Sequence, residues 1–259
     1  MTDSAFILAI DTSTPTASVA ITSGTLADGA VRAVFSWRSA HSHSSSLLPI
    51  IKNMMAEVQI GFEPLSGLAG LVGLAVGLGP GSFTGLRIAM ATAKGLAAAT
   101  GLPLYGISSL DVLAAAVASE RQVCAVLDAR KQEIYAGRYR LVLGQPPERL
   151  GDIVAIKPEA VGALIDAPCL FVGDAVPVYD ALWRRQLGAL YQTAPACCHF
   201  PSAAALGLLA GELRQQGRAL PLAVATPLYI RASDAELNLG QAVGSMRPIT
   251  TMANIAKMP

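Results

Sequence analysis

Residues 71–106 read LVGLAVGLGPGSFTGLRIAMATAKGLAAATGLPLYG. The uncharged apolar run at 71–78 is typical of a buried strand, and the glycine-rich loop at 79–85 separates it from an alanine-rich segment. That segment, 86–100, predicts a helix that stops at Gly101, since glycine commonly ends helices. Residues 102–106 return to a strand pattern. The order predicts a β-α-β unit and therefore an α/β protein.

Upstream of this unit, three short apolar runs at 6–10, 18–22 and 31–37 are separated by polar turns, which predicts an antiparallel meander. A helix follows, with Ser44 or Ser45 as the candidate N-cap and Pro49 in the first turn. Its apolar positions make an unusually wide stripe: Leu47, Leu48, Ile51, Met54, Met55 and Val58.

The second half of the chain repeats the mixture of hairpin and helix. We predict helices at 108–118, 176–190 and 202–217, and strands at 123–128, 133–142 and 169–173. The pattern divides the chain into one lobe at 1–105 and another at 106–232, with helix 202–217 a candidate to pack back on the first lobe. Apolar periodicity is lost after Ser233, so residues 233–259 are expected to be a weakly structured tail.

Composition excludes several classes of protein. Nineteen Lys and Arg against 18 Asp and Glu leave a net charge of +1, which gives no overall field to attract nucleic acid. The uncharged stretch 64–86 is long enough to cross a membrane, but Pro80-Gly81 breaks it. The N-terminus has no signal-peptide pattern, and the four cysteines form no C-x-x-C pair. We therefore expect a cytoplasmic protein with no membrane contact and no metal site.

Two stretches could carry chemistry. Asp11-Thr12-Ser13 follows a strand, where a carboxylate and hydroxyls can hold a metal-bound nucleotide; the alternative is a turn in which these groups satisfy backbone amides. Residues 79–87 could bind an anion at the helix start with help from Arg87, although the G-K-[ST] of a Walker A loop is absent. The alternative here is a structural turn with Ser82 or Thr84 as helix cap.

Several motifs lie along the chain, at residues 7–13, 44–51, 79–87, 93–96, 107–110, 127–130, 172–174 and 227–231. Taken together, they resemble the TsaB (YeaZ) family of bacterial proteins of tRNA threonylcarbamoyladenosine synthesis. The resemblance runs from about Phe6 to Arg231, and its 79–87 block is highly specific. It implies a two-lobed actin-like (ASKHA, ribonuclease H-like) fold with mixed sheets flanked by helices.

The same resemblance implies kinship to TsaD, the transferase that carries a metal-binding H-x-x-x-H motif. Here the corresponding positions hold Ser109 and Leu113, which are poor ligands for a transition metal. The resemblance therefore implies a non-catalytic subunit that dimerises with a TsaD-type transferase and activates it. A TsaE-type ATPase would complete the assembly, tRNA would be reached only through it, and the chain alone would form a homodimer. ATP or ADP with magnesium is expected only at the level of the complex, with Asp11 and Thr12 as the candidate nucleotide contacts.

A second hypothesis makes the chain an ATP-dependent phosphotransferase or ATPase, in which Asp11 and Thr12 grip Mg-ATP and Asp128 is a second carboxylate. A metallopeptidase is the weakest hypothesis, since no nucleophile or metal set supports it. The dimer surface is expected on the two helices of the first lobe. Burial of these helices against their own sheet is the competing interpretation for most of the residues concerned: Leu48, Ile51, Met55, Arg87, Ala89, Ala93 and Ala97.

Overall fold

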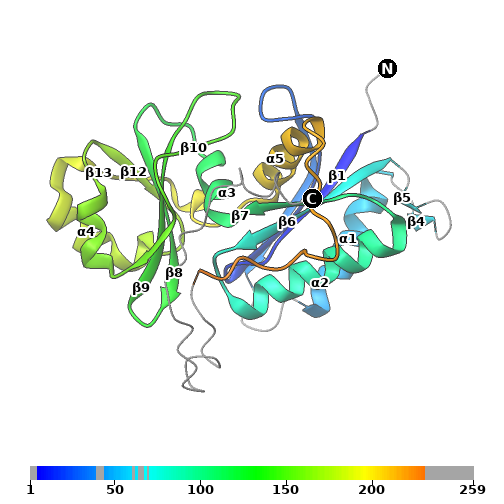
Figure 1. Cartoon of the computed structure of the whole chain (residues 1–259), viewed down its shortest axis with the longest axis horizontal. Coiled ribbons are helices and arrows are strands. Elements are labelled where there is room, and N and C mark those ends of the chain that lie inside the picture. The colour runs from blue at the N-terminus through cyan, green and yellow to red at the C-terminus, as the bar shows by residue number, and fades with distance from the viewer. Residues whose placement is uncertain (1–4, 39–43, 60–61, 64–66, 69, 231–259) are drawn as a thin grey trace.

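A computed structural model describes residues 5–38, 44–59, 62–63, 67–68 and 70–230. Two large β-sheets stand side by side, and each is flanked by helices (Figure 1). The boundary predicted between residues 105 and 106 falls inside strand β7 (Leu104–Ser108). The predicted tail, 233–259, lies outside the described residues. No helix in the described part of the chain is long and apolar enough to cross a membrane.

The first sheet has the strand order β3-β2-β1-β6-β7. Strands β1 (Phe6–Asp11), β2 (Thr16–Ser23) and β3 (Ala30–Arg38) are antiparallel neighbours, which confirms the predicted meander. Strand β6 (Leu71–Gly79) runs parallel to both β1 and β7. Helix α2 (Phe83–Thr100) connects β6 to β7, so the predicted β-α-β unit is also confirmed.

Alternating residues of β1 point to opposite faces of this sheet and bury different helices. Leu8 and Ile10 pack in one core with α1 (Ser44–Glu57) and α2. Ile7 and Ala9 pack in another core with α5 (Ala203–Gln215), which crosses the opposite face. Figure 1 shows α5 above the sheet and the other two helices below it. A strand buried on both faces explains why the β1 sequence is almost wholly apolar.

The second sheet has the order β10-β9-β8-β12-β13, and β11 (Val154–Ile156) pairs with β9 beyond this path. Strands β8 (Gln122–Arg130) and β9 (Glu133–Arg140) form the predicted hairpin. Strand β12 (Cys169–Val172) runs parallel to both β8 and β13 (Tyr191–Thr193), while β10 (Glu148–Arg149) lies at the edge. Helix α4 (Val176–Leu187) covers one face through Trp183, which packs with Phe171.

The remaining elements are short. They are α3 (Ser109–Ala115), strands β4 (Phe62–Glu63) and β5 (Gly67–Leu68), and the 3₁₀ turns η1 (Pro158–Leu164), η2 (Gly188–Leu190) and η3 (Ala196–Cys198).

Two helix predictions were too long. The helix predicted at 108–118 ends at Ala115, and the one predicted at 176–190 ends at Leu187 because Gly188 has a positive φ of 54°. A third expectation was wrong in position: Pro49 is the sixth residue of α1 rather than part of its first turn.

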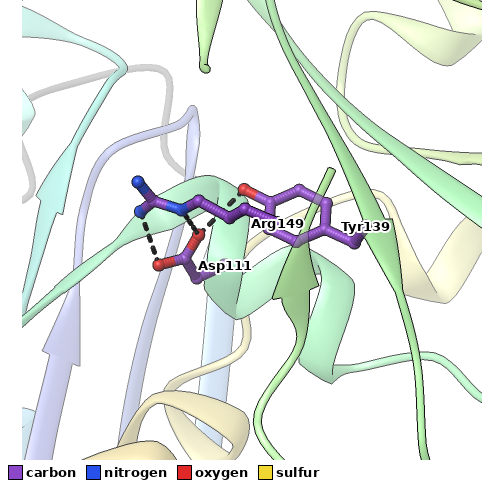
Figure 2. A network of polar contacts seen from close by, with 3 residues as sticks. All are labelled: Asp111, Tyr139 and Arg149. Atoms are coloured by element: carbon purple, nitrogen blue, oxygen red, sulfur yellow. Dashed lines mark hydrogen bonds and ion pairs between the residues drawn. The ribbon is translucent and has the colours of Figure 1, made fainter. Parts of the chain in front are cut away.

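Helix α3 is fastened to the second sheet by an ion pair (Figure 2). The Arg149 guanidinium donates to both carboxylate oxygens of Asp111, from Nε to Oδ1 over 2.8 Å and from Nη2 to Oδ2 over 2.6 Å. The Tyr139 hydroxyl also donates to Oδ1 over 2.8 Å. The ion-paired side chains are only 16% and 24% exposed, so the carboxylate has exchanged most of its water for these three donors.

We expect Asp111→Ala to lower the free energy of unfolding by about 2 kcal/mol. Losing one partner of a buried pair costs about 3–5 kcal/mol, and the partial exposure here reduces that figure. The matched control is Arg140→Ala, which breaks an ion pair whose side chains are 60% and 61% exposed and should change stability by less than about 0.5 kcal/mol. Equal losses in urea unfolding of the two variants would contradict this ranking.

Candidate functional site

A cavity of about 250 Å³ lies between the two sheets. Five segments that are far apart in sequence meet around it, and each contributes to a motif quoted above or lies beside one. The β8–β9 hairpin, the start of α2 and the chain near residue 228 come together here (Figure 1). The lining residues are Ser13, Pro15, Pro80, Gly81, Ser82, Phe83, Thr84, Leu86, Asp128, Ala129, Arg130, Tyr135, Asp174, Leu228, Tyr229 and Ile230.

Asp11, at the end of β1, is fully buried behind the wall of this cavity. Its Oδ1 accepts hydrogen bonds from the amide and the hydroxyl of Ser13, over 2.8 and 2.6 Å. Its Oδ2 accepts one from the Ser109 hydroxyl over 3.2 Å. Burial raises the pKa of Asp11 from 3.8 to about 6, although these hydrogen bonds act in the opposite direction.

The turn that follows Asp11 packs directly on the loop that starts α2. The Thr12 hydroxyl donates to the Gly85 carbonyl over 2.6 Å, and the Ser82 amide donates to the Ser13 carbonyl over 2.7 Å. Three glycines permit this approach, because a Cβ on Gly81 or Gly85 would overlap the turn's backbone, and one on Gly77 would overlap the Asp11 carboxylate. Glycine is needed here for space.

These contacts favour the structural interpretation that the sequence left open for both stretches. The Ser82 hydroxyl accepts from the Gly85 amide over 3.3 Å and so caps α2. Asp11 and Thr12 are 0% and 1% exposed, and neither lines the cavity. Both side chains, the candidate nucleotide contacts, are bonded within the protein and present almost no surface to a ligand.

The opposite wall of the cavity carries two carboxylates and a strained turn. Asp174 Oδ1 accepts from the Asp128 amide over 2.9 Å, and Asp128 Oδ1 accepts from the Arg130 amide over 2.8 Å. Burial, together with the nearby Asp128 charge, raises the pKa of Asp174 to about 6. Arg130, Lys131 and Gln132 all have left-handed φ values, 63°, 51° and 60°, which cost about 1–2 kcal/mol per residue.

The chain after α5 returns across the first lobe and ends its described course in the cavity. The Lys94 ammonium donates to the Ala225 carbonyl over 3.1 Å, and the Leu228 amide donates to the Leu78 carbonyl over 2.7 Å. The Tyr229 ring then packs against the Phe83 ring in a tilted arrangement, with centroids 5.1 Å apart and an interplanar angle of 35°.

Arg87, a candidate anion and interface residue, joins this aromatic pair. Its guanidinium lies 3.7 Å above the Phe83 ring and donates from Nε to the Tyr229 hydroxyl over 3.3 Å. Sequence reasoning identified Arg87 but neither aromatic partner as a site residue. The signal for both aromatic residues is their place in motifs of the resemblance, Phe83 in 79–87 and Tyr229 in 227–231.

Ser109 and Leu113, at the positions implied for metal ligands, are both fully buried. Ser109 bonds to Asp11, while Leu113 packs in the core beneath the second sheet. The described residues contain no group of three or more His, Cys, Asp or Glu side chains that could hold a metal ion. A hydroxyl and an isobutyl group at these two positions do not make a transition-metal site.

The predicted dimer residues separate into two groups, and most need correction. Leu48, at 54% exposed, and Arg87 lie at the surface. Five others lie in the core between the helices and their own sheet, at no more than 1% exposed, because they point toward β1, β2 and β6: Ile51, Met55, Ala89, Ala93 and Ala97. A charge at Met55 or Ala93 would therefore damage the fold before it could affect an interface.

The fold and the cavity define a two-lobed α/β protein of the actin-like type. Residues 37–239 match the family model described as "TsaD: tRNA N6-adenosine threonylcarbamoyltransferase", and the chain belongs to this family.

Relatives with similar sequences align with most of the chain. An uncharacterized protein of Mycobacterium tuberculosis H37Rv is 32% identical over 232 residues, covering 89% of this chain and 93% of its own length. The tRNA threonylcarbamoyladenosine biosynthesis protein TsaB of Bacillus subtilis is 28% identical over 233 residues, covering 89% of this chain and 96% of that protein. The chain spans only about half, 56%, of a Mycobacterium leprae relative that is 32% identical.

Among solved structures, YeaZ from Pseudomonas aeruginosa superposes with a TM-score of 0.71 at 27% sequence identity. The alignment covers 87% of this chain and 99% of that one. Similarity to TsaB and YeaZ proteins is therefore present in both sequence and fold, as the motifs predicted.

The contact between turn and loop predicts opposite effects for two glycines of the same helix. Gly85→Ala should destabilise the protein by more than about 3 kcal/mol, because the new Cβ overlaps the Thr12 carbonyl. Gly95→Ala meets nothing within 4 Å and should stabilise by about 0.5–1 kcal/mol through helix propensity. Urea unfolding measures both, and a Gly85→Ala protein as stable as Gly95→Ala would contradict the packing described.

Asp11 should make stability depend on pH. Because its pKa of about 6 in the folded protein lies above the ordinary value of 3.8, its contribution to stability is complete below about pH 4 and is lost as pH rises through 6. At about 1.4 kcal/mol per pKa unit, the loss is about 3 kcal/mol.

Asp11→Asn, which keeps an oxygen acceptor for Ser13, should therefore gain stability over the wild type as pH rises from 4 to 7. Asp152→Asn, at an exposed position, is the control that should follow the wild type. Parallel stability curves for wild type and Asp11→Asn would disprove the burial effect.

Proposed function

We propose that this chain is a non-catalytic subunit required for tRNA N6-threonylcarbamoyladenosine modification, which pairs with a TsaD-type transferase and activates it. One observation carries the proposal. The two positions at which the resemblance implies metal ligands are occupied by buried residues that are poor ligands, Ser109 and Leu113. The name of the B. subtilis relative supports the pathway, and the family match supports kinship to the transferase. On this proposal the chain retains the fold of the transferase family, while the catalytic residues lie in the partner.

The same proposal includes a homodimer when the chain is alone, a TsaE-type ATPase in the assembly, and tRNA contact only through the complex. The alternative, an ATP-dependent phosphotransferase or ATPase, has less support. It needs the side chains of Asp11 and Thr12 to contact Mg-ATP, and both side chains are buried and hydrogen-bonded within the protein. Asp128 does line the cavity, but it bonds to Arg130 at its Oδ1 and pairs with the same residue at Oδ2. These residues therefore do not fit a bound magnesium nucleotide.

We propose the partner surface on the outer faces of α1 and α2, which keep Leu48 from the predicted set and add exposed small residues of α2. Leu48 is an exposed apolar side chain on α1. Ala91, Gly95 and Ala98 are exposed on α2, and Gly95 has open space around it. Small residues let another helix approach closely, and an exposed large apolar residue supplies area to bury. This surface serves both self-association and the transferase.

Reconstitution tests the function. The purified chain alone should produce no threonylcarbamoyladenosine in tRNA, and the transferase with the other components should be far less active until this chain is added. Mass spectrometry of digested tRNA measures the product. Transfer by this chain alone at the rate of the complete mixture would overturn the proposal, as would full activity without it.

Surface variants test the partner face separately from the fold. Gly95→Arg and Leu48→Glu should each weaken self-association and transferase binding by at least about tenfold, which corresponds to about 1.4 kcal/mol. Val178→Arg replaces a 63% exposed side chain on the other lobe and is the matched control. Sedimentation and pull-down report association, with circular dichroism to check folding. Unchanged binding in both folded variants would remove this face from consideration.

A further inference from the structure

Two adjacent thiols lie at the surface of the second lobe. Cys197 and Cys198 end the 3₁₀ turn η3, and neither forms a disulfide in the structure. Their sulfur atoms are 3.9 Å apart. Cys197 is exposed, whereas Cys198 is half-buried and packs against the core that contains Leu170 and Ala194. The established family and the proposed function assign nothing to this pair.

The spacing of the sulfurs suits a bridge of one atom better than a direct bond. A disulfide needs about 2.05 Å between sulfurs, and usually about 4.4–6.8 Å between Cα atoms. Neighbouring residues have Cα atoms only about 3.8 Å apart, so a disulfide here would be strained. By contrast, an ion bound at about 2.3 Å from each sulfur with a tetrahedral angle holds the sulfurs about 3.8 Å apart.

The turn that carries the thiols is held at both ends. The Cys198 amide donates to the Pro195 carbonyl over 2.9 Å, and the His199 amide donates to the Ala196 carbonyl over 3.3 Å. The His199 side chain is fastened as well, since its Nδ1 accepts from the Gly173 amide over 3.2 Å. A turn ordered before binding loses little entropy when a ligand bridges it, which favours chelation.

We propose that Cys197 and Cys198 form a two-thiolate chelate for a soft, thiophilic metal ion. Thiolates select soft ions over hard ones. In the binding step each S–H bond breaks, both protons pass to solvent, and two sulfur–metal bonds form with no change in oxidation state. Solvent completes the coordination, because the described residues offer no group of three ligating side chains. Through His199, the site lies next to Gly173-Asp174 at the edge of the cavity.

Cadmium chloride is the probe, and calorimetry on the reduced, full-length protein is the measurement. We expect one tight cadmium per chain. Cys197→Ser and Cys198→Ser should each weaken it by at least about 100-fold, because the loss of one thiolate abolishes the chelate. The control is the Cys124→Ala/Cys169→Ala double variant, which removes the buried cysteines and should bind as the wild type does.

Three results would overturn the proposal: no tight binding to the wild type, unchanged affinity in both serine variants, or loss of binding in the buried-cysteine control. Cys197 is exposed, so Cys197→Ser should fold normally and keeps the test decisive if Cys198→Ser is unstable. Transferase activation plays no part in the measurement, so the outcome is independent of the proposed function.

Discussion

The close approach of the turn after β1 to the loop before α2 is the constraint on which the rest of this molecule depends. A threonine hydroxyl bonds to the Gly85 carbonyl and a backbone amide bonds to the Ser13 carbonyl, while Gly77, Gly81 and Gly85 leave room for the contact. The contact sets where α2 begins and therefore where Phe83 and Arg87 stand. It also sets one wall of the cavity between the sheets.

The same contact explains why this cleft of the actin-like type has so few exposed ionisable side chains on the wall formed by the first lobe. The Asp11 carboxylate oxygens, which could have faced a ligand, point into the protein and accept hydrogen bonds from Ser13 and Ser109. On the other wall, Asp128 and Asp174 support the left-handed turn at Arg130. Burial makes Asp11 and Asp174 harder to ionise. Their hydrogen bonds to Ser13, Ser109 and the Asp128 amide tie both carboxylates into the fold.

Where sequence reasoning succeeded, the signal was local. The apolar run at 71–78, the glycine loop and the helix stop at Gly101 determine their β-α-β unit within about 35 residues, and the structure follows them closely. It failed where a residue's role depends on which side of its helix meets the sheet. Ala89, Ala93 and Ala97 have the spacing of a helix-packing face, but the face they form packs on this chain's own strands. Periodicity identifies a face without naming its partner.

The sequence by itself determined the class of fold, the strand and helix order and the motifs that gather at one cavity, because propensity, turn residues and apolar period act over a few residues. Only the tertiary structure decided that Asp11 is sealed, that Tyr229 crosses to Phe83, and that Arg149 reaches Asp111. The Arg149–Asp111 and Tyr229–Phe83 contacts join residues 38 and 146 positions apart in the chain. The burial of Asp11 likewise depends on distant segments that pack around it. Such contacts form only when the sheets and helices pack, so no local pattern encodes them.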